Sequence, residues 1–190
     1  MTVLVAPADI VSFWRVAGPD KWFAQDASFD ATIRSRFLPA YEAAASGALA
    51  AWEDDATGAL ALLLLLDQFS RNMFRGNARA FATDALARAV ADRALIRGFD
   101  QATDPALRPF FYLPLMHSEA LADQDRCVRL YEVLGDAALL RYATEHRDVV
   151  RQFGRFPHRN RALGRETTPV EQAFLDADRA DDPTGEPDPG

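Results

Sequence analysis

Apolar residues recur at helical spacing along most of the chain, and this pattern predicts an all-α protein. In residues 29–45, aromatic and aliphatic side chains recur every four positions, at Phe29, Ile33, Phe37 and Tyr41. This spacing places them on one face of a helix. No segment alternates apolar and polar residues with period two for long, and β-branched residues are sparse, so we expect no β-sheet.

An uninterrupted aliphatic run at residues 59–66 predicts the central helix of the fold, buried on all sides. It is too short to span a bilayer, which takes about 20 apolar residues. The same periodicity predicts further helices around it, at residues 8–16, 29–45, 79–96, 117–134, 136–153 and 169–175. Between the helices predicted at 79–96 and 117–134, helical or 3₁₀ structure leads to Pro114, where we expect a kink or a break.

Start and stop signals support these boundaries. Gly135 and Gly154 follow the last apolar residues of two helices, and Asp136 can cap the second of them. Thr168 and Glu171 flank Pro169 in the pattern of a capping box. Short loops favour antiparallel neighbours, so we expect stacked antiparallel helix hairpins around the 59–66 helix. The prediction is a single globular domain over residues 1–175, followed by a disordered acidic tail at 176–190.

The net charge of −7 is concentrated in that tail, which holds six acids and one base and therefore contributes −5. The body is left at −2, which argues against a nucleic-acid binder. The single cysteine, Cys127, excludes an intramolecular disulfide and suits a reducing cytosol. The first ten residues do not resemble a signal peptide, so we expect a cytoplasmic protein without a membrane segment.

Three short segments concentrate polar residues in this apolar body, and the first is residues 67–75. If the central helix continues through them, Asp67, Arg71 and Arg75 lie on one line, and Gln68 and Asn72 lie on a parallel line. A structural ion pair between Asp67 and Arg71 would explain why these two residues occur in an apolar helix. Gln68, Asn72 and Arg75 are harder to explain by folding alone and are candidate ligand-binding residues.

The second segment, residues 112–119, contains His117 and Glu119. His117 begins an apolar stripe in the predicted 117–134 helix, and His146 lies on the apolar face of the next helix. Two imidazoles on consecutive antiparallel helices could share a polar pocket. The alternative is that each is a core histidine that is hydrogen-bonded to a neighbour.

The third segment, residues 151–165, holds five arginines and a histidine but no acid. Arg155, His158, Arg159 and Asn160 are its candidate ligand-binding residues. Such a patch can bind phosphate or carboxylate groups. The alternative is that the arginines neutralise helix C-termini and nearby acids such as Glu145 and Asp148.

Motifs for metal or cofactor binding are absent from the sequence. Three histidines could in principle hold zinc, but no pair has the i, i+4 spacing of a helical zinc motif. There is no phosphate-binding glycine loop, no G-x-S-x-G and no paired-cysteine motif. We therefore expect neither a metal nor a cofactor.

Several long motifs resemble an uncharacterised bacterial family, domain of unknown function 924. They are FDATIRSRF at 29–37, LLLLLDQFSRNMFRG at 62–76, FFYLPLMHSE at 110–119, HRDVVRQFGRFPHRN at 146–160 and LGRETTPVE at 163–171. The resemblance covers nearly the whole chain before the tail. It implies a helical fold similar to tetratricopeptide-repeat proteins, in agreement with the helix hairpins, and it implies no activity or catalytic residues.

The leading hypothesis is an α-helical binding domain whose pocket takes a small anionic ligand or an acidic peptide. Its hydrogen-bond donors to the anion would be the arginines Arg71, Arg75, Arg155 and Arg159. Histidine and amide side chains would orient the ligand, namely His117, His146, His158, Gln68 and Asn160. One alternative is a hydrolase or lyase with His117 or His146 as general base, oriented by Asp67 or Glu119. A second is a protein-interaction module with a groove between helices. RNA binding is the weakest option, and the oligomeric state is open.

Overall fold

A computed structural model describes residues 5–181, and all regular structure in that range is helical. The helices of one turn or more are α1 (Pro7–Ala17), α2 (Pro19–Trp22), α3 (Ala27–Ala45), α4 (Ala56–Leu63), α5 (Ser70–Met73), α6 (Asp84–Ile96), α7 (Leu113–Met116), α8 (Leu121–Leu134), α9 (Ala137–Phe153) and α10 (Pro169–Asp181). A π-helical turn, Leu64–Phe69, joins α4 to α5. Short 3₁₀ segments lie at Ala50–Asp54, Ala78–Phe81, Arg108–Phe111 and Pro157–Arg159. The all-α prediction is confirmed, while the stacking of hairpins in the manner of tetratricopeptide repeats stays a prediction.

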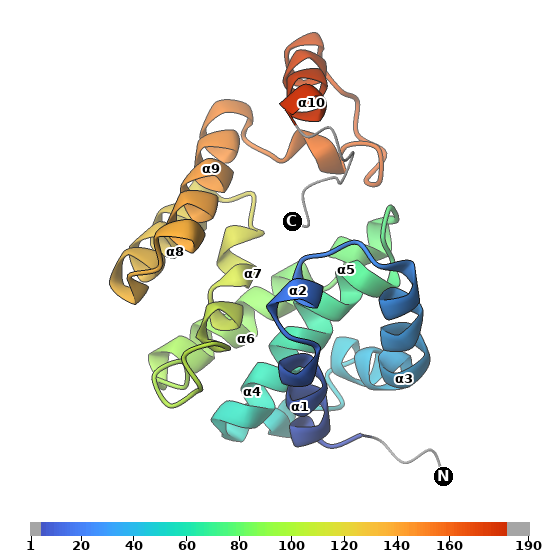
Figure 1. The fold of residues 1–190 in the computed structure, drawn as a ribbon, viewed down its shortest axis with the longest axis vertical. Coiled ribbons are helices and arrows are strands. Elements are labelled where there is room, and N and C mark those ends of the chain that lie inside the picture. The colour runs from blue at the N-terminus through green and yellow to red at the C-terminus, as the bar shows by residue number, and fades with distance from the viewer. Residues whose placement is uncertain (1–4, 182–190) are drawn as a thin grey trace. The chain divides into compact units, whose positions relative to one another are not determined.

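The chain forms two compact units. Unit 1 comprises Met1–Arg75 and Arg79–Leu115, and unit 2 comprises Gly76–Ala78 and Met116–Gly190. Figure 1 shows α1 to α6 in unit 1 and α8 to α10 in unit 2. The two units are described separately below.

Unit 1 is built around the predicted central helix. α4, the π-helical turn and α5 form one continuous helical segment, and side chains from 58 to 74 are all buried. α1 and α6 pack against α4, and α3 packs against the π-helical turn and α5 (Figure 1). The aliphatic run therefore has neighbouring helices on several sides, as its lack of a polar face requires.

An aromatic cluster links three of these helices. The Phe69 ring lies 5.4 Å from Trp14 of α1 and 5.0 Å from Phe37 of α3, measured between ring centroids. Trp14 also stands edge-on to Phe110 at 5.6 Å. All four rings are almost completely buried. Buried aromatic side chains contribute large apolar area, so this cluster fixes how α1 and α3 pack on the central segment.

Unit 2 contains an antiparallel hairpin of α8 and α9, followed by a loop and α10 (Figure 1). The predicted boundaries hold here. Gly135 and Gly154 end α8 and α9 in the left-handed conformation, with φ of 78° and 69°, and the Asp136 side chain accepts hydrogen bonds at the start of α9. The capping box at Thr168 is confirmed by two hydrogen bonds, from the Thr168 amide to Glu171 and from the Glu171 amide to Thr168 Oγ1.

Three predicted boundaries differ from the structure. The helix predicted over 117–134 begins only at Leu121, because Gln124 donates to the carbonyls of Met116 and Ser118 and holds the preceding residues out of helical conformation. The helix predicted over 79–96 begins at Asp84, after a 3₁₀ turn. α10 runs to Asp181 rather than ending at 175, so the first part of the predicted tail is helical. Residues 182–190 of that tail lie outside the described range.

Candidate functional site

The polar segment 67–75 lies in unit 1, where its side chains pair with carboxylates. Arg71 Nη1 is 3.3 Å from Asp67 Oδ1, at the predicted i, i+4 spacing. The same guanidinium donates two hydrogen bonds to the Asp84 carboxylate in bidentate geometry, at 3.0 and 3.2 Å. Arg71 and Asp67 are both buried. A buried charge requires such partners, so this geometry favours the structural interpretation of the pair.

The remaining members of this segment also have fold partners. Gln68 donates to Asp67 Oδ2 at 2.7 Å. Asn72 and Arg75 both bind Asp30 of α3, at 2.7 Å for the amide and at 2.9 and 3.2 Å for the guanidinium. These contacts tie α5 and the residues just after it to the first turn of α3, and they give Arg75 a role in folding that the sequence did not indicate.

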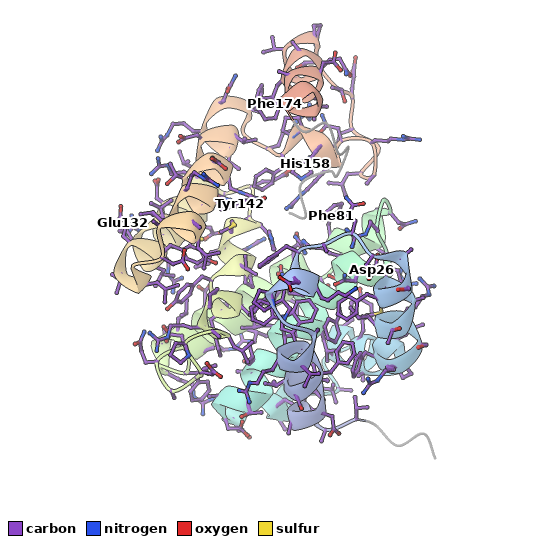
Figure 2. All side chains as sticks on the ribbon, viewed as in Figure 1. Asp26, Phe81, Glu132, Tyr142, His158 and Phe174 are labelled. Atoms are coloured by element: carbon purple, nitrogen blue, oxygen red, sulfur yellow. The ribbon has the colours of Figure 1, made fainter. Side chains whose placement is uncertain are left out.

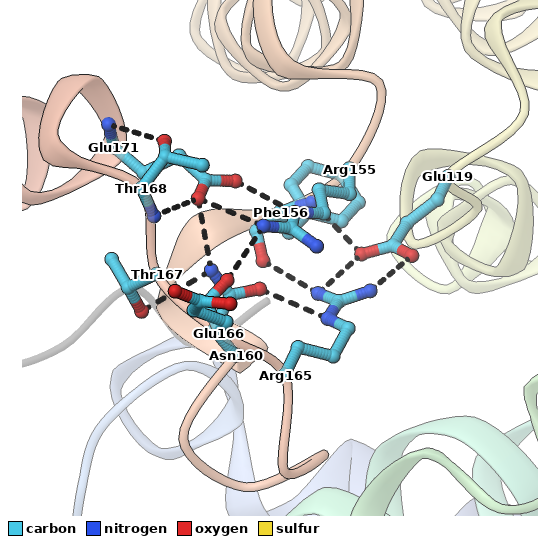
Figure 3. A network of polar contacts seen from close by, with 9 residues as sticks. All are labelled: Glu119, Arg155, Phe156, Asn160, Arg165, Glu166, Thr167, Thr168 and Glu171. Atoms are coloured by element: carbon cyan, nitrogen blue, oxygen red, sulfur yellow. Dashed lines mark hydrogen bonds and ion pairs between the residues drawn. The ribbon is translucent and has the colours of Figure 1, made fainter.

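In unit 2, a network of polar contacts surrounds Glu119, which lies between α7 and α8 (Figure 3). Both of its oxygens accept from Arg165, at 2.7 and 2.9 Å, and Oε1 also accepts from the Phe156 amide at 2.8 Å. Arg165 reaches further, to the Phe156 carbonyl and Asn160 Oδ1, each at 2.9 Å. Burial opposes ionisation of Glu119, but the hydrogen bonds from Arg165 and Phe156 outweigh it and lower the pKa of the carboxyl.

Glu171 is the second centre of this network (Figure 3). It accepts two hydrogen bonds from Arg155, at 2.6 and 2.8 Å, and one from the Thr168 amide. The Arg155 contact, followed by the Thr168 amide, lowers the pKa of Glu171 to about 2. Asn160 Nδ2 lies 3.4 Å from the same carboxylate. Arg155 and Asn160 thereby attach the 154–168 loop to the start of α10.

The segment 151–165 is accordingly not an open positive patch. Arg151 contacts Asp148 at 3.1 Å and Asp125 at 3.6 Å, while Arg155 and Arg165 pair with glutamates from α10 and from the α7–α8 connection. The acids that neutralise these arginines all lie outside the segment, which has none of its own. The interpretation of neutralised local charge therefore holds for Arg151, Arg155 and Arg165.

Phe156 is the meeting point of the remaining candidates in unit 2. Its ring centroid is 5.6 Å from the His146 ring and 5.5 Å from the His158 ring, and the Arg159 guanidinium carbon lies 4.4 Å over it. Arg159 Nη1 also donates to the His117 carbonyl at 2.9 Å. We call Phe156, His146, His158 and Arg159 the Phe156 cluster. Phe156, His146 and Arg159 are buried, and His158 is partly exposed.

The orientation of His146 is fixed by its own helix. Its Nδ1 lies 2.9 Å from the carbonyl oxygen of Tyr142, one turn earlier on α9. This carbonyl takes the orienting place at Nδ1 that a carboxylate was expected to fill, and Glu119, one of the two expected carboxylates, is bound to Arg165. The use of His146 or His117 as a general base stays a prediction.

The structure thus divides the predicted site residues into two groups. Gln68, Arg71, Asn72 and Arg75 belong to unit 1, together with Asp67, whereas His117, Glu119, His146, Arg155, His158, Arg159 and Asn160 belong to unit 2. That all of them form one pocket stays a prediction. Phe156 and Tyr142 were not among the candidates, and only the aromatic residues beside the basic segment hinted at Phe156.

Neither a metal-binding cluster nor a membrane-spanning helix occurs in the part of the chain that the structure describes. No group of three or more His, Cys, Asp or Glu side chains there could hold a metal ion. No helix within that part has both the length and the apolar character needed to cross a bilayer.

The described residues therefore form an all-helical fold with a polar cluster around Phe156. A family model described as a bacterial protein of unknown function (DUF924) matches residues 10–179, so the chain belongs to this family. The chain is similar to a solved protein of unknown function from Agrobacterium tumefaciens, with 54% identity and a TM-score of 0.87 over 89% of this chain and 96% of that one. No curated protein matches the chain. The family and the solved relative thus support the fold, and neither indicates a function for the site.

Proposed function

We propose that unit 2 binds a small oxyanion, a phosphate or carboxylate group of a cytoplasmic metabolite or acidic peptide, at the Phe156 cluster. One observation carries the proposal: two of the three histidines and Arg159 gather around a single buried phenylalanine ring. The third histidine, His117, takes part through its carbonyl, which accepts from Arg159.

The chemistry of these side chains favours an anion. A guanidinium offers five N–H donors in a fixed plane and no acceptor, and it binds carboxylate and phosphate groups with two parallel hydrogen bonds. Imidazoles add donors, and they add positive charge when protonated. A buried setting strengthens each of these interactions, because less water competes for the ligand.

The surrounding network supports the proposal by holding the cluster in place. The backbone of Phe156 is bound on both sides, since its amide donates to Glu119 and its carbonyl accepts from Arg165. Arg155 anchors the same loop to α10 through Glu171. Binding groups that are ordered before the ligand arrives lose less entropy on binding.

The test is a thermal-shift and calorimetric titration of the full chain with inorganic phosphate, sulfate and small dicarboxylates. A ligand at 100 times its Kd stabilises by about 2.7 kcal/mol. For a chain of this size, that raises the melting temperature by roughly 5–10 °C. We expect Arg159→Lys and His158→Ala each to weaken binding at least tenfold.

The matched control is Arg161→Gln, because Arg161 is exposed in the same loop and its loss removes a positive charge that Arg159→Lys retains. This variant should bind within about twofold of wild type, as expected of an exposed charge. The proposal is wrong if no oxyanion binds the wild-type chain. It is also wrong if Arg161→Gln weakens binding as much as Arg159→Lys and His158→Ala do, because the effect would then not be specific to the Phe156 cluster.

A further inference from the structure

Arg155 and Asn160 hold the Glu171 carboxylate in the way that a binding protein holds the carboxylate of a ligand (Figure 3). Arg155 Nε donates to Oε1 at 2.6 Å and Nη2 donates to Oε2 at 2.8 Å, which is the bidentate geometry of guanidinium–carboxylate recognition. Asn160 Nδ2 lies 3.4 Å from Oε2. The two receiving residues belong to the loop after α9, whereas the carboxylate belongs to α10, so separate elements supply the site and its occupant.

Glu171 is also the main buried contact of α10. It is the one buried residue between positions 169 and 177, where the apolar side chains are exposed or half-buried. Beyond this carboxylate, α10 packs against the 3₁₀ segment Pro157–Arg159, and the Phe174 ring, labelled in Figure 2, lies 5.0 Å from the Phe153 ring at the end of α9. Helices of about 12–15 residues are marginal by themselves in water, so the position of α10 depends on these few contacts.

The α8–α9 hairpin, in contrast, is held by the burial of apolar side chains. Val128, Ala143 and Val150 are buried there, and the two helices pack against each other. Elements with few buried apolar contacts open at a lower free energy than elements with many. α10 can therefore leave its place while the hairpin stays folded, and Arg155 and Asn160 then lose their resident carboxylate.

We propose that Arg155 and Asn160 form a carboxylate site that α10 fills from within the chain, and that an acidic partner peptide takes the place of Glu171 when α10 undocks. The two contacts of α10 define the partner: a glutamate on Arg155 and, three residues later on the same helix face, an aromatic side chain on Phe153. Docked α10 competes with this partner and lowers its affinity. The site is separate from the Phe156 cluster, so either can fail without the other.

The first experiment removes the resident carboxylate and supplies another from solution. Glu171→Ala deletes a CH₂–COO⁻ group, which acetate closely matches. We expect about 100 mM acetate, compared with chloride at the same ionic strength, to raise the melting temperature of Glu171→Ala by about 3–6 °C more than that of wild type, as binding at about tenfold Kd predicts. Wild type is the reference, because acetate bound at the Phe156 cluster would act on both chains alike. An equal rise in the two chains would overturn the carboxylate site.

Two control variants locate the acetate effect. Glu166→Ala removes an exposed acid from the same loop and leaves the Glu171 carboxylate in place, so its response to acetate should match that of wild type. Glu171→Ala combined with Arg155→Met lacks the cation of the site, and the additional rise should disappear. If the double variant keeps that rise, acetate acts elsewhere and the assignment to Arg155 is wrong.

A peptide with the α10 sequence tests whether the helix competes with a partner. The probe is residues 167–177, TTPVEQAFLDA, added in trans to full-length wild type and to full-length Glu171→Ala. Because docked α10 closes the wild-type site, we expect the peptide to bind Glu171→Ala at least about tenfold more tightly. The Glu171→Gln and Phe174→Ala forms of the peptide should bind at least about tenfold more weakly, as expected for loss of a charge pair or an aromatic anchor. Equal binding of the unchanged peptide to both chains would refute competition by α10.

Hydrogen exchange in the wild-type chain covers the case in which Glu171→Ala does not fold. The Gln172 amide donates to the Thr168 carbonyl at 2.9 Å in the first turn of α10, and it reports the opening of this helix. We expect it to exchange at least about 100-fold faster than the core amides of α9. Adding the peptide should accelerate it further, because the peptide traps the open state. Exchange of Gln172 at the rate of the α9 core, or no acceleration by the peptide, would contradict the proposal.

Discussion

Replacing Arg165 by Met tests how the loop that carries the Phe156 cluster is held. The Arg165 guanidinium donates to three groups from different parts of unit 2: the Glu119 carboxylate, the Phe156 carbonyl and the Asn160 amide oxygen. Methionine retains much of the aliphatic volume and removes every donor. The change leaves the part-buried Glu119 with the Phe156 amide and without its cation.

The expected cost follows from burial. Breaking a buried ion pair by removing one partner costs about 3–5 kcal/mol, because the other charge stays desolvated. Here the side chains of Arg165 and Glu119 are 21% and 30% exposed, so water compensates in part. We expect a loss of about 2–3 kcal/mol in the free energy of unfolding, or roughly 5–10 °C in melting temperature.

The assay combines denaturant unfolding with hydrogen exchange of the Phe156 amide, which donates to Glu119. In Arg165→Met, this amide should exchange faster along with the loss of stability. Arg161→Met is the matched control, since Arg161 is exposed in the same loop, and it should change stability by less than about 0.5 kcal/mol. Equal effects of the two substitutions would refute the reasoning.

Two further predictions concern other parts of the chain. A Cβ on Gly58 would lie 2.0 Å from the Trp52 carbonyl oxygen, so Gly58→Ala should destabilise unit 1 by about 1–3 kcal/mol despite the better helix propensity of alanine. The control is Thr57→Ala at an exposed position, which should not destabilise the unit. A higher melting temperature in Gly58→Ala would count against this close approach. Because its pairing with Arg155 lowers the pKa of Glu171 to about 2, the stability that this pair contributes should be complete above about pH 4.5 and fade as the pH falls toward 2. The difference in melting temperature between wild type and Glu171→Gln should therefore shrink over that interval, and a constant difference would contradict the pairing.

Local chemistry explains why much of the fold was predictable from the sequence. Gly135 and Gly154 stop helices because they adopt a left-handed conformation that other residues avoid, and Asp136 and Thr168 start helices because their side chains accept from exposed amides. These effects involve residues within a few positions of one another. A single sequence therefore contains all the information they need.

The partners of the polar residues could not be predicted, because they lie far away in the sequence. Arg71 pairs with Asp84, Arg75 with Asp30 and Arg155 with Glu171, over 13, 45 and 16 positions. Only the i, i+4 contact of Arg71 with Asp67 was visible as a pattern. The sequence therefore overstated the positive charge of these segments.

The break before α8 has the same origin. Apolar periodicity predicted a continuous helix from 117, but the buried Gln124 side chain binds the carbonyls of Met116 and Ser118. A tertiary hydrogen bond overrides periodicity there. His117 consequently lies outside a helix, and its carbonyl is available to accept from Arg159.

The most direct test of the oxyanion site at the Phe156 cluster uses the fact that the chain has only three histidines. Their imidazole resonances can be followed by nuclear magnetic resonance while hydrogen phosphate is added to the full chain. The account predicts saturable shifts of the His146 and His158 signals with a common affinity, and loss of both in Arg159→Lys. Imidazole signals that stay unchanged up to tens of millimolar phosphate, roughly the limit of useful affinity, would contradict the account.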